Sequence, residues 1–404
     1  MSEYTGFVII LASGLFFSEF FKRLRLPYVV ALIVAGIAIG PLGLNLIELT
    51  PPIIFLGSVG AVFVMFMAGM EVRTDLLIRM KKKLVVLVLM NGGIPAIVGF
   101  FIAFLFGYEI LTSMIVATIF ISSSIAVIIP TLEEKNVLSS DIGSVIIGAV
   151  IIEDIASLFL LSIILQSNDP TTFLPLPIFI VVVALSALFL KWLLPRFENW
   201  FFTEKNRGRF EEEFQFVLIV TIAVTVFFEF IGVHAIVAGF LVGLILAESI
   251  KNHKIENKLH AISYGLFIPI FLLEIGIETD LTVLFDVSGA TFLVIAIIVG
   301  LIVSKLLSGY FAGRLIGFRN RNSVLIGAAS MPQLSTSLAV AFTALELGFI
   351  DSSLQVSIVL LSITTVLISP LLIGLIFIPR KRHPSPTTET ENLKVQPQDQ
   401  KSDE

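Results

Sequence analysis

Apolar runs long enough to cross a lipid bilayer recur from one end of this 404-residue sequence to the other. A helix needs about 20 apolar residues to span the hydrocarbon core, and these runs have about 18–25. Backbone polar groups inside a bilayer must be satisfied within the protein, so only helices and closed barrels span it. The short alternating segments of a barrel are absent from the sequence. The sequence therefore predicts an all-α polytopic membrane protein.

Composition agrees with this prediction, because 56% of the residues are hydrophobic, only 14% are charged and the mean hydropathy is +1.01. We predict thirteen transmembrane helices. Their approximate limits are 4–21, 27–44, 53–70, 84–106, 112–132, 142–166, 173–195, 211–231, 233–249, 261–279, 287–313, 322–345 and 353–379. The polar residues 380–404, rich in Pro, Thr and Gln, are predicted to be a disordered tail.

The basic residues give the topology. Of the 26 Lys and Arg residues, all but Lys305 follow an odd-numbered segment. Because cytoplasmic loops carry the excess of Lys and Arg, the N-terminus is expected outside the cell and the C-terminus in the cytoplasm. The membrane is expected to be the cell (inner) membrane of a prokaryote. A wrong segment count would disrupt this alternation, so the pattern also favours thirteen.

An internal repeat is visible at an offset of 207 residues. PYVVALIVAGIAIG in the second segment is similar to AIVAGFLVGLILA in the ninth, and GMEVRTDL is similar to GIETDL. Gly36 then corresponds to Gly243, and Gly69 to Gly276. The alternative is that any two helices rich in Val, Gly and Ile look alike. We interpret the chain as two six-helix repeats joined by the linker helix 173–195, which inverts the second, as in secondary transporters.

Two adjacent acids, Glu153 and Asp154, lie near the middle of the apolar run 142–166. A carboxylate at the bilayer centre costs roughly 2.5–3.5 kcal/mol on insertion scales, so such residues are functional candidates. The two side chains are about 100° apart around a helix. One carboxylate is expected to face the crossing of the fifth and twelfth segments as a ligand. The other is expected to pair with Lys305, the only basic residue far from a helix end. The alternative is a structural ion pair and one idle acid.

Polar interruptions occur in two segments at corresponding places of the two repeats. Ser122, Ser123 and Ser124 precede Pro130 in the fifth segment. The twelfth segment carries Pro332, Gln333, Ser335, Thr336 and Ser337. Proline removes a backbone hydrogen bond, and paired interrupted helices indicate the binding site of a transporter. The alternative is a kink with small-residue helix packing.

Other polar residues carry weaker signals. We interpret Glu71, Glu274 and Glu278 as acids that cap or pair at helix ends, with an ion funnel as the alternative. His234 is the only histidine of four in an apolar segment, and the chain has no cysteine, so a zinc site is not expected. No cofactor is expected.

These motifs resemble those of the monovalent cation:proton antiporters, in the branch of NapA-like Na⁺/H⁺ antiporters and Kef-like K⁺ efflux systems. The resemblance covers about residues 4–379. It rests on LPYVVALIVAGIAIGPLGL, FMAGMEVRTDL, the pair SSSIAVIIPTL and IGAVIIEDIASL, and SKLLSGYFAGRLIGF. The Kef-like nucleotide-binding domain and a GxGxxG motif are absent after the last segment.

The resemblance implies a membrane domain over 1–379 with a scaffold (4–70 and 211–279) that forms a homodimer. It also implies a core (84–166 and 287–379) with crossed, discontinuous helices that shifts in an elevator-like motion. Asp154 would bind Na⁺ or a proton, with Ser123 and Ser124 beside it, and Glu153 would have Lys305 as its partner. Ser122, Gln333, Ser335 and Thr336 are further candidates for lining the site.

The expected function is exchange of Na⁺ or Li⁺ for H⁺ by alternating access, and not an enzymatic reaction. K⁺/H⁺ exchange is the alternative, followed by a cation channel and an intramembrane protease. Two features differ from the family pattern: Glu153 precedes Asp154 where relatives have Asp or Asn, and Gln333 follows Pro332 where relatives often carry charged residues. A charged residue at 153 favours electrogenic exchange.

Overall fold

The computed structural model describes residues 3–23, 27–71, 81–138, 140–168, 175–201, 210–247, 253–282 and 290–376. The tail predicted at 380–404 lies outside the described residues. All regular structure in the described part is helical. Its elements are α1 (Glu3–Arg23), α2 (Tyr28–Ile39), α3 (Pro51–Met70), α5 (Lys81–Asn91), α6 (Gly93–Leu105), α7 (Ile110–Ile121), α8 (Ile125–Glu134), α9 (Asp141–Asn168), α10 (Leu176–Phe201), α11 (Phe210–Ile231), α12 (Ala235–Ala247), α13 (His253–Ile262), the π-helix η1 (Ser263–Phe267), α14 (Ile268–Glu278), α15 (Ala290–Leu315), α16 (Asn320–Ala329), α17 (Ser335–Glu346) and α18 (Ser352–Ile376).

Many of these helices have the length and composition of membrane spans. Among the described residues, nine helical stretches are long and apolar enough to cross a bilayer. Three shorter apolar helices cover Tyr28–Ile39, Gln215–Ile231 and Ala235–Ala247. The prediction of an all-α protein with many membrane-spanning helices is therefore confirmed.

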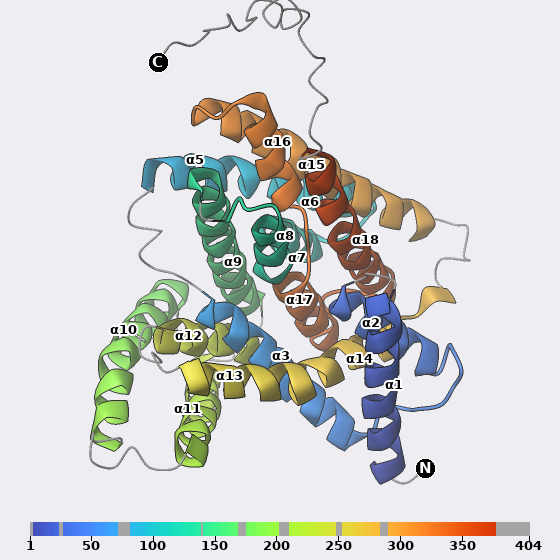
Figure 1. Ribbon diagram of the computed structural model, residues 1–404, viewed down its shortest axis with the longest axis vertical. Helices are drawn as coiled ribbons and strands as arrows, with labels where there is room; N and C mark the ends of the chain where they lie inside the picture. Colours follow the sequence, from blue (N-terminus) through green and yellow to red (C-terminus); the bar gives the residue numbers. More distant parts are fainter. Residues whose placement is uncertain are drawn as a thin grey trace, which may run out of the picture.

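The helices form two groups (Figure 1). In the view of Figure 1, the lower group contains α1–α3 and α11–α14, and the upper group contains α5–α8, α15 and α16 with most of α9 and α18. α17 continues from the upper group toward the lower one and packs on α18 and α7. Within the lower group α3 packs on α12 and α14, and α2 packs on α14. Within the upper group α15 packs on α16, α18 and α6, and α7 packs on α6 and α9.

Glycines allow the lower group to pack very closely. A Cβ atom added at Gly36 of α2 would lie 2.2 Å from the Leu273 carbonyl oxygen and 2.9 Å from the Gly276 Cα atom. A Cβ atom added at Gly69 of α3 would lie 2.3 Å from the Phe240 carbonyl oxygen and 3.0 Å from the Gly243 carbonyl carbon. Small residues let membrane helices approach backbone to backbone, so these glycines determine how α2 and α3 meet α14 and α12.

Two helices of the upper group are interrupted in their middle. The first interruption separates α7 from α8 at Ser122–Ser124, where Ser122 and Ser124 are in extended conformation. The second separates α16 from α17 at residues 330–334. Pro332 lies within the second interruption, whereas Pro130 lies inside α8, which continues through it. The first interruption is therefore made by the serines, whose freed backbone groups bond to the other interrupted helix.

Candidate functional site

The two interruptions are joined through backbone and side-chain hydrogen bonds. The Ser124 amide donates to the Pro332 carbonyl oxygen at 2.7 Å. The Gln333 side-chain amide donates to the Ser122 carbonyl oxygen at 2.6 Å. A buried backbone group without a partner is costly, so each interruption is stable because the other supplies its missing partners. The symmetric polar motifs of the sequence thus lie side by side.

Side chains of the two interruptions form a second set of contacts. The Ser122 hydroxyl lies 3.1 Å from Gln333 Oε1 and 2.8 Å from Ser337 Oγ, and Ser337 also donates to Gln333 Oε1. The Gln333 amide nitrogen of the backbone donates to Thr365 Oγ1 on α18 at 3.1 Å. Ser122 and Gln333 therefore hold the crossing together, and their oxygen atoms are already occupied by protein donors.

Asp154 reaches this crossing from α9. Its side chain is buried, and its Oδ1 atom accepts a 3.3 Å hydrogen bond from the Ser123 amide. The hydroxyl oxygen of Ser124 is buried without a hydrogen-bond partner, and the buried hydroxyl of Thr336 faces the Asp154 carboxyl. A buried carboxylate beside hydroxyl groups is the kind of oxygen-rich setting that binds hard cations.

Glu153 has a different environment from Asp154, one residue later. Its Oε2 atom lies 3.0 Å from Lys305 Nζ on α15, and both side chains have no exposed surface. Lys305 Nζ also donates to the Ile121 carbonyl oxygen at 2.8 Å and lies 3.1 Å from the Ser123 hydroxyl. A buried ion pair is tolerated when further hydrogen bonds satisfy the remaining donors and acceptors of the two side chains, as they do here. The charge of Glu153 is therefore balanced by Lys305, whereas within the described residues no basic side chain forms an ion pair with Asp154.

One residue of this network was not singled out from the sequence. Asn91, at the end of α5, donates to Glu153 Oε1 at 3.1 Å and accepts from the Ser308 hydroxyl at 3.0 Å. It binds one carboxylate oxygen of Glu153, Oε1, while Lys305 binds the other, Oε2. The available signal was a lone Asn in an apolar run followed by two glycines, which coincides with the interruption between α5 and α6 at Gly92.

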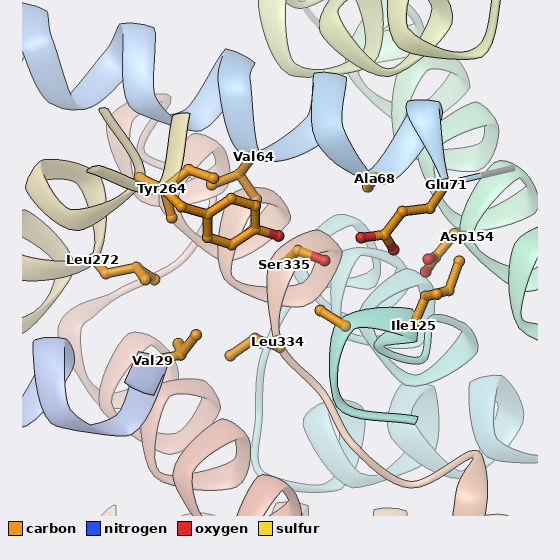
Figure 2. A pocket seen from close by; sticks show the side chains of 12 residues that line it. Val29, Val64, Ala68, Glu71, Ile125, Asp154, Tyr264, Leu272, Leu334 and Ser335 are labelled. Atoms are coloured by element: carbon orange, nitrogen blue, oxygen red, sulfur yellow. The ribbon is translucent and has the colours of Figure 1, made fainter. Parts of the chain in front are cut away.

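A cavity leads to Asp154 from the end of α3 (Figure 2). Glu71 and Tyr264 lie along it, and Ser335 and Leu334 form part of its wall beside the crossing. Figure 2 shows the Tyr264 ring pointing toward Glu71, with Asp154 beyond the Glu71 carboxyl. Tyr264 belongs to η1, and π-helical turns of this kind occur often at functional sites. Glu71 therefore lines the route to Asp154, which the sequence had favoured less than capping or pairing.

The weaker candidates of the sequence lie elsewhere. Glu274 is on α14, buried, and His234 lies between α11 and α12 at a separate cavity lined by Ser162, Gln166 and Glu229. Within the described residues, no group of three or more His, Cys, Asp or Glu side chains is arranged to hold a metal ion.

A membrane protein with crossed interrupted helices around a buried acid pair has the architecture of a secondary transporter. The family model described as sodium/hydrogen exchanger, transmembrane, matches residues 7–378, and the chain belongs to this family. The family resemblance noted from the sequence motifs is thereby confirmed. It is a family of transporters rather than of enzymes.

Individual relatives agree. The chain is 32% identical over 387 residues to the probable Na⁺/H⁺ antiporter 3 of Methanocaldococcus jannaschii, covering 93% of this chain and 97% of that protein. It is 26% identical to the Na⁺/H⁺-K⁺ antiporter GerN of Bacillus cereus, covering 90% of this chain and 93% of that protein. The solved structure of the sodium proton antiporter MjNhaP1 from M. jannaschii at pH 8 has the same fold, with a TM-score of 0.70 at 16% identity over 92% of this chain and 96% of that one.

Proposed function

We propose that this protein exchanges Na⁺, and also Li⁺, for H⁺ across a membrane, with Asp154 as the residue that binds either ion. The observation that carries the proposal is that the two adjacent acids, Glu153 and Asp154, have different partners. Glu153 is paired with Lys305, whereas Asp154, which has no ion pair within the described residues, accepts from the Ser123 amide, faces Thr336 and lies at the end of a cavity. A buried carboxylate without a basic partner is stabilised by a proton or by a cation.

Competition at Asp154 couples the two ions. The carboxylate holds a proton or a cation, but not both, so release of one is linked to uptake of the other. Ser123 and Ser124 are proposed ligands with Asp154, and Glu153 supports them through the Ser123 hydroxyl, which lies 3.0 Å from Glu153 Oε2. Ser335 and Thr336 line the site, while Ser122 and Gln333 hold its framework. Charge carried by Glu153 and Lys305 favours an electrogenic cycle.

We also propose the inverted-repeat architecture for this chain. In a two-fold arrangement, a contact between one residue and another implies the same contact with the roles exchanged. With an offset of 207, the contact of Gly36 with Gly276 corresponds to that of Gly69 with Gly243, and the two glycine pairs pack in both places. The proposed count of thirteen helices is supported when each interrupted helix is counted as one span. In that count α7 and α8 are one span, and α16 and α17 are another.

The two helix groups support the proposed division into a scaffold (4–70 and 211–279) and a core (84–166 and 287–379), joined by the linker 173–195. The Asp154 cavity is lined by both, with Glu71 and Tyr264 from the scaffold and Asp154 and Ser335 from the core. Movement of the core against the scaffold would expose Asp154 alternately to the two sides. We propose a homodimer in the cell membrane, with the N-terminus outside.

Na⁺ is the first candidate because it is the cation common to the names of the two relatives cited above, a probable Na⁺/H⁺ antiporter and a Na⁺/H⁺-K⁺ antiporter. The experiment uses purified protein in liposomes that contain a pH-sensitive dye and an imposed proton gradient. Na⁺, Li⁺, K⁺ and choline are added in turn. We expect dye recovery with Na⁺ and Li⁺, and none with choline. A response to K⁺ alone would replace this proposal with K⁺/H⁺ exchange.

The matched control is Asp154→Asn, which keeps the shape of the side chain and removes its charge. We expect this variant to insert and to melt like a folded protein, but to give no ion-dependent dye recovery. Unchanged exchange by Asp154→Asn would overturn the assignment of the binding residue. Absence of a response to every cation by the unmodified protein, over a wide pH range, would overturn antiport itself.

A further inference from the structure

Glu274 of α14 is a second buried acid, outside the site described above. Its side chain is 1% exposed, and neither of its carboxyl oxygens has a hydrogen-bond partner. The pairing or capping that the sequence suggested for it is therefore not present. It is unusual for both oxygens of a buried carboxyl group to lack a hydrogen-bond partner, because buried polar side chains are nearly always hydrogen-bonded.

Gly57 of α3 makes room for this carboxyl group. A Cβ atom at Gly57 would lie 1.5 Å from Glu274 Oε2 and 2.5 Å from the carboxyl carbon. Any residue larger than glycine at position 57 would push the carboxyl group away. Glu274 therefore lies in a space that one helix leaves open for it, between two helices of the scaffold group.

The charged groups that face Glu274 are both acids. Glu278 lies one turn later on α14, and Glu346 lies at the end of α17. The other packed helices bring no basic side chain to this level. α3 has no acid or base among Pro51–Met70, α2 has only Tyr28 at its far end, and α1 meets α14 through Gly14, away from its charged ends.

These surroundings determine what Glu274 can bind. An ionised carboxylate that is buried without donors, and beside two further acids, is strongly disfavoured relative to the neutral acid. A metal ion would need several ligands at once, and within the described residues the acids do not form such a cluster. A proton needs only one oxygen atom. The ligand class that fits is therefore H⁺.

We propose that Glu274 is a second proton-binding site of this protein, distinct from Asp154 and filled in the conformation described here. The two sites are well separated, because Gly57 and Glu71 are 14 positions apart on α3, or about 20 Å along its axis. This proposal concerns a proton held by the scaffold and does not depend on Na⁺/H⁺ exchange.

The position of Glu346 gives the second site a regulatory consequence. Glu346 belongs to the core helix α17, whereas Glu274 and Glu278 belong to the scaffold helix α14. This consequence, unlike the proton site itself, rests on the proposed movement of the core against the scaffold. That movement changes the spacing of these acids, so the proton at Glu274 favours the arrangement in which they are close. By linkage, that arrangement also favours the proton. Loss of the proton at alkaline pH would then oppose this conformation.

The test is infrared spectroscopy of the protein in lipid, in the Asp154→Asn background, so that the first site contributes no carboxyl signal and transport is absent. At neutral pH we expect a carbonyl band of a buried neutral carboxylic acid. Adding Glu274→Gln should remove it, whereas adding Glu278→Gln, the matched control one turn away, should leave it. A band that is the same with and without Glu274→Gln would overturn the proposal.

Gly57→Ala provides a second, independent variant. It keeps the carboxyl group of Glu274 but displaces it from its buried position, so we expect the same band to weaken or disappear. Thermal melting between pH 6 and pH 10 is the companion measurement. The background protein should lose stability toward alkaline pH, and Glu274→Gln, which mimics the neutral acid, should lose less. An equal loss in both proteins, or a band unaffected by Gly57→Ala, would overturn the proposal.

Discussion

The Ser123 hydroxyl donates a 2.7 Å hydrogen bond to the carbonyl oxygen of Ser330, and these residues are 207 positions apart. This separation equals the offset that relates Gly36 to Gly243 and Gly69 to Gly276. Residues related by a two-fold axis meet each other only where they lie on it. The proposed symmetry axis therefore passes through the crossing of the interrupted helices, next to the Asp154 carboxyl. The proposed site would then lie where the two proposed repeats meet.

Removing Lys305 should destabilise the protein strongly. Lys305→Met would leave Glu153 as a buried charge without its basic partner, and breaking a buried ion pair typically costs about 3–5 kcal/mol. We predict a large drop in melting temperature in detergent. The double variant Lys305→Met/Glu153→Leu removes both charges and should recover most of the loss. If the double variant melted as early as the single one, the pair would not be the source of the stability.

Gly36 should not tolerate a side chain. The Cβ atom of Gly36→Ala would lie 2.2 Å from the Leu273 carbonyl oxygen, a backbone atom that cannot move without separating α2 from α14. Overpacking of this kind costs about 1–3 kcal/mol, and we predict a lower melting temperature. Gly374→Ala on α18 is the matched control, since nothing lies within 4 Å of its added Cβ atom. It should melt at the same temperature or slightly higher. Equal effects of the two substitutions would contradict the role of close packing.

Gln333 should contribute to stability through Ser122. Gln333→Ala removes the donor to the Ser122 carbonyl oxygen, and a buried acceptor left unsatisfied costs about 1–3 kcal/mol. It also removes the acceptor that the Ser122 and Ser337 hydroxyls share, although these two hydroxyls still contact each other. We predict a lower melting temperature and weaker apparent affinity for the exchanged cation. A double-mutant cycle with Ser122→Ala measures the coupling, which should be clearly non-additive because both residues belong to one network. Additive losses would show that the two interruptions are held independently.

Tyr108 links the loop after α6 to the start of α18, because its hydroxyl lies 3.1 Å from both carboxylate oxygens of Asp351. Burial, and then the Asp351 carboxylate, raise the pKa of Tyr108 above its ordinary value of 10.0. Since the pKa is higher in the folded protein, the stabilisation is complete below about pH 10 and is lost as the pH rises through the folded value. We predict that the unmodified protein loses thermal stability above about pH 10 more steeply than Tyr108→Phe. Parallel pH profiles of the two proteins would contradict this.

Part of the site was predictable from the sequence because single residue types carry large energetic costs in a membrane. Glu153, Asp154 and Lys305 were identified as buried charges. Because Glu153 and Asp154 are adjacent on one helix, their side chains were predicted to have different environments. The serines and Gln333 were found from matching positions in the two halves. Asn91 was not found, because an isolated amide in an apolar run carries no cost that distinguishes it from a helix-packing residue.

The sequence by itself determined the all-α membrane class, since runs of apolar residues leave the backbone no other way to satisfy its hydrogen bonds. It also indicated which residues carry charge at mid-membrane. The tertiary structure confirmed the partner that the resemblance implied for Lys305, which is Glu153, and it alone gave the contacts that hold the first helix interruption at Ser122–Ser124. It alone placed Glu274 against Gly57. These features depend on contacts between helices far apart in the chain, where a donor or a vacant space on one helix determines what the other can keep buried.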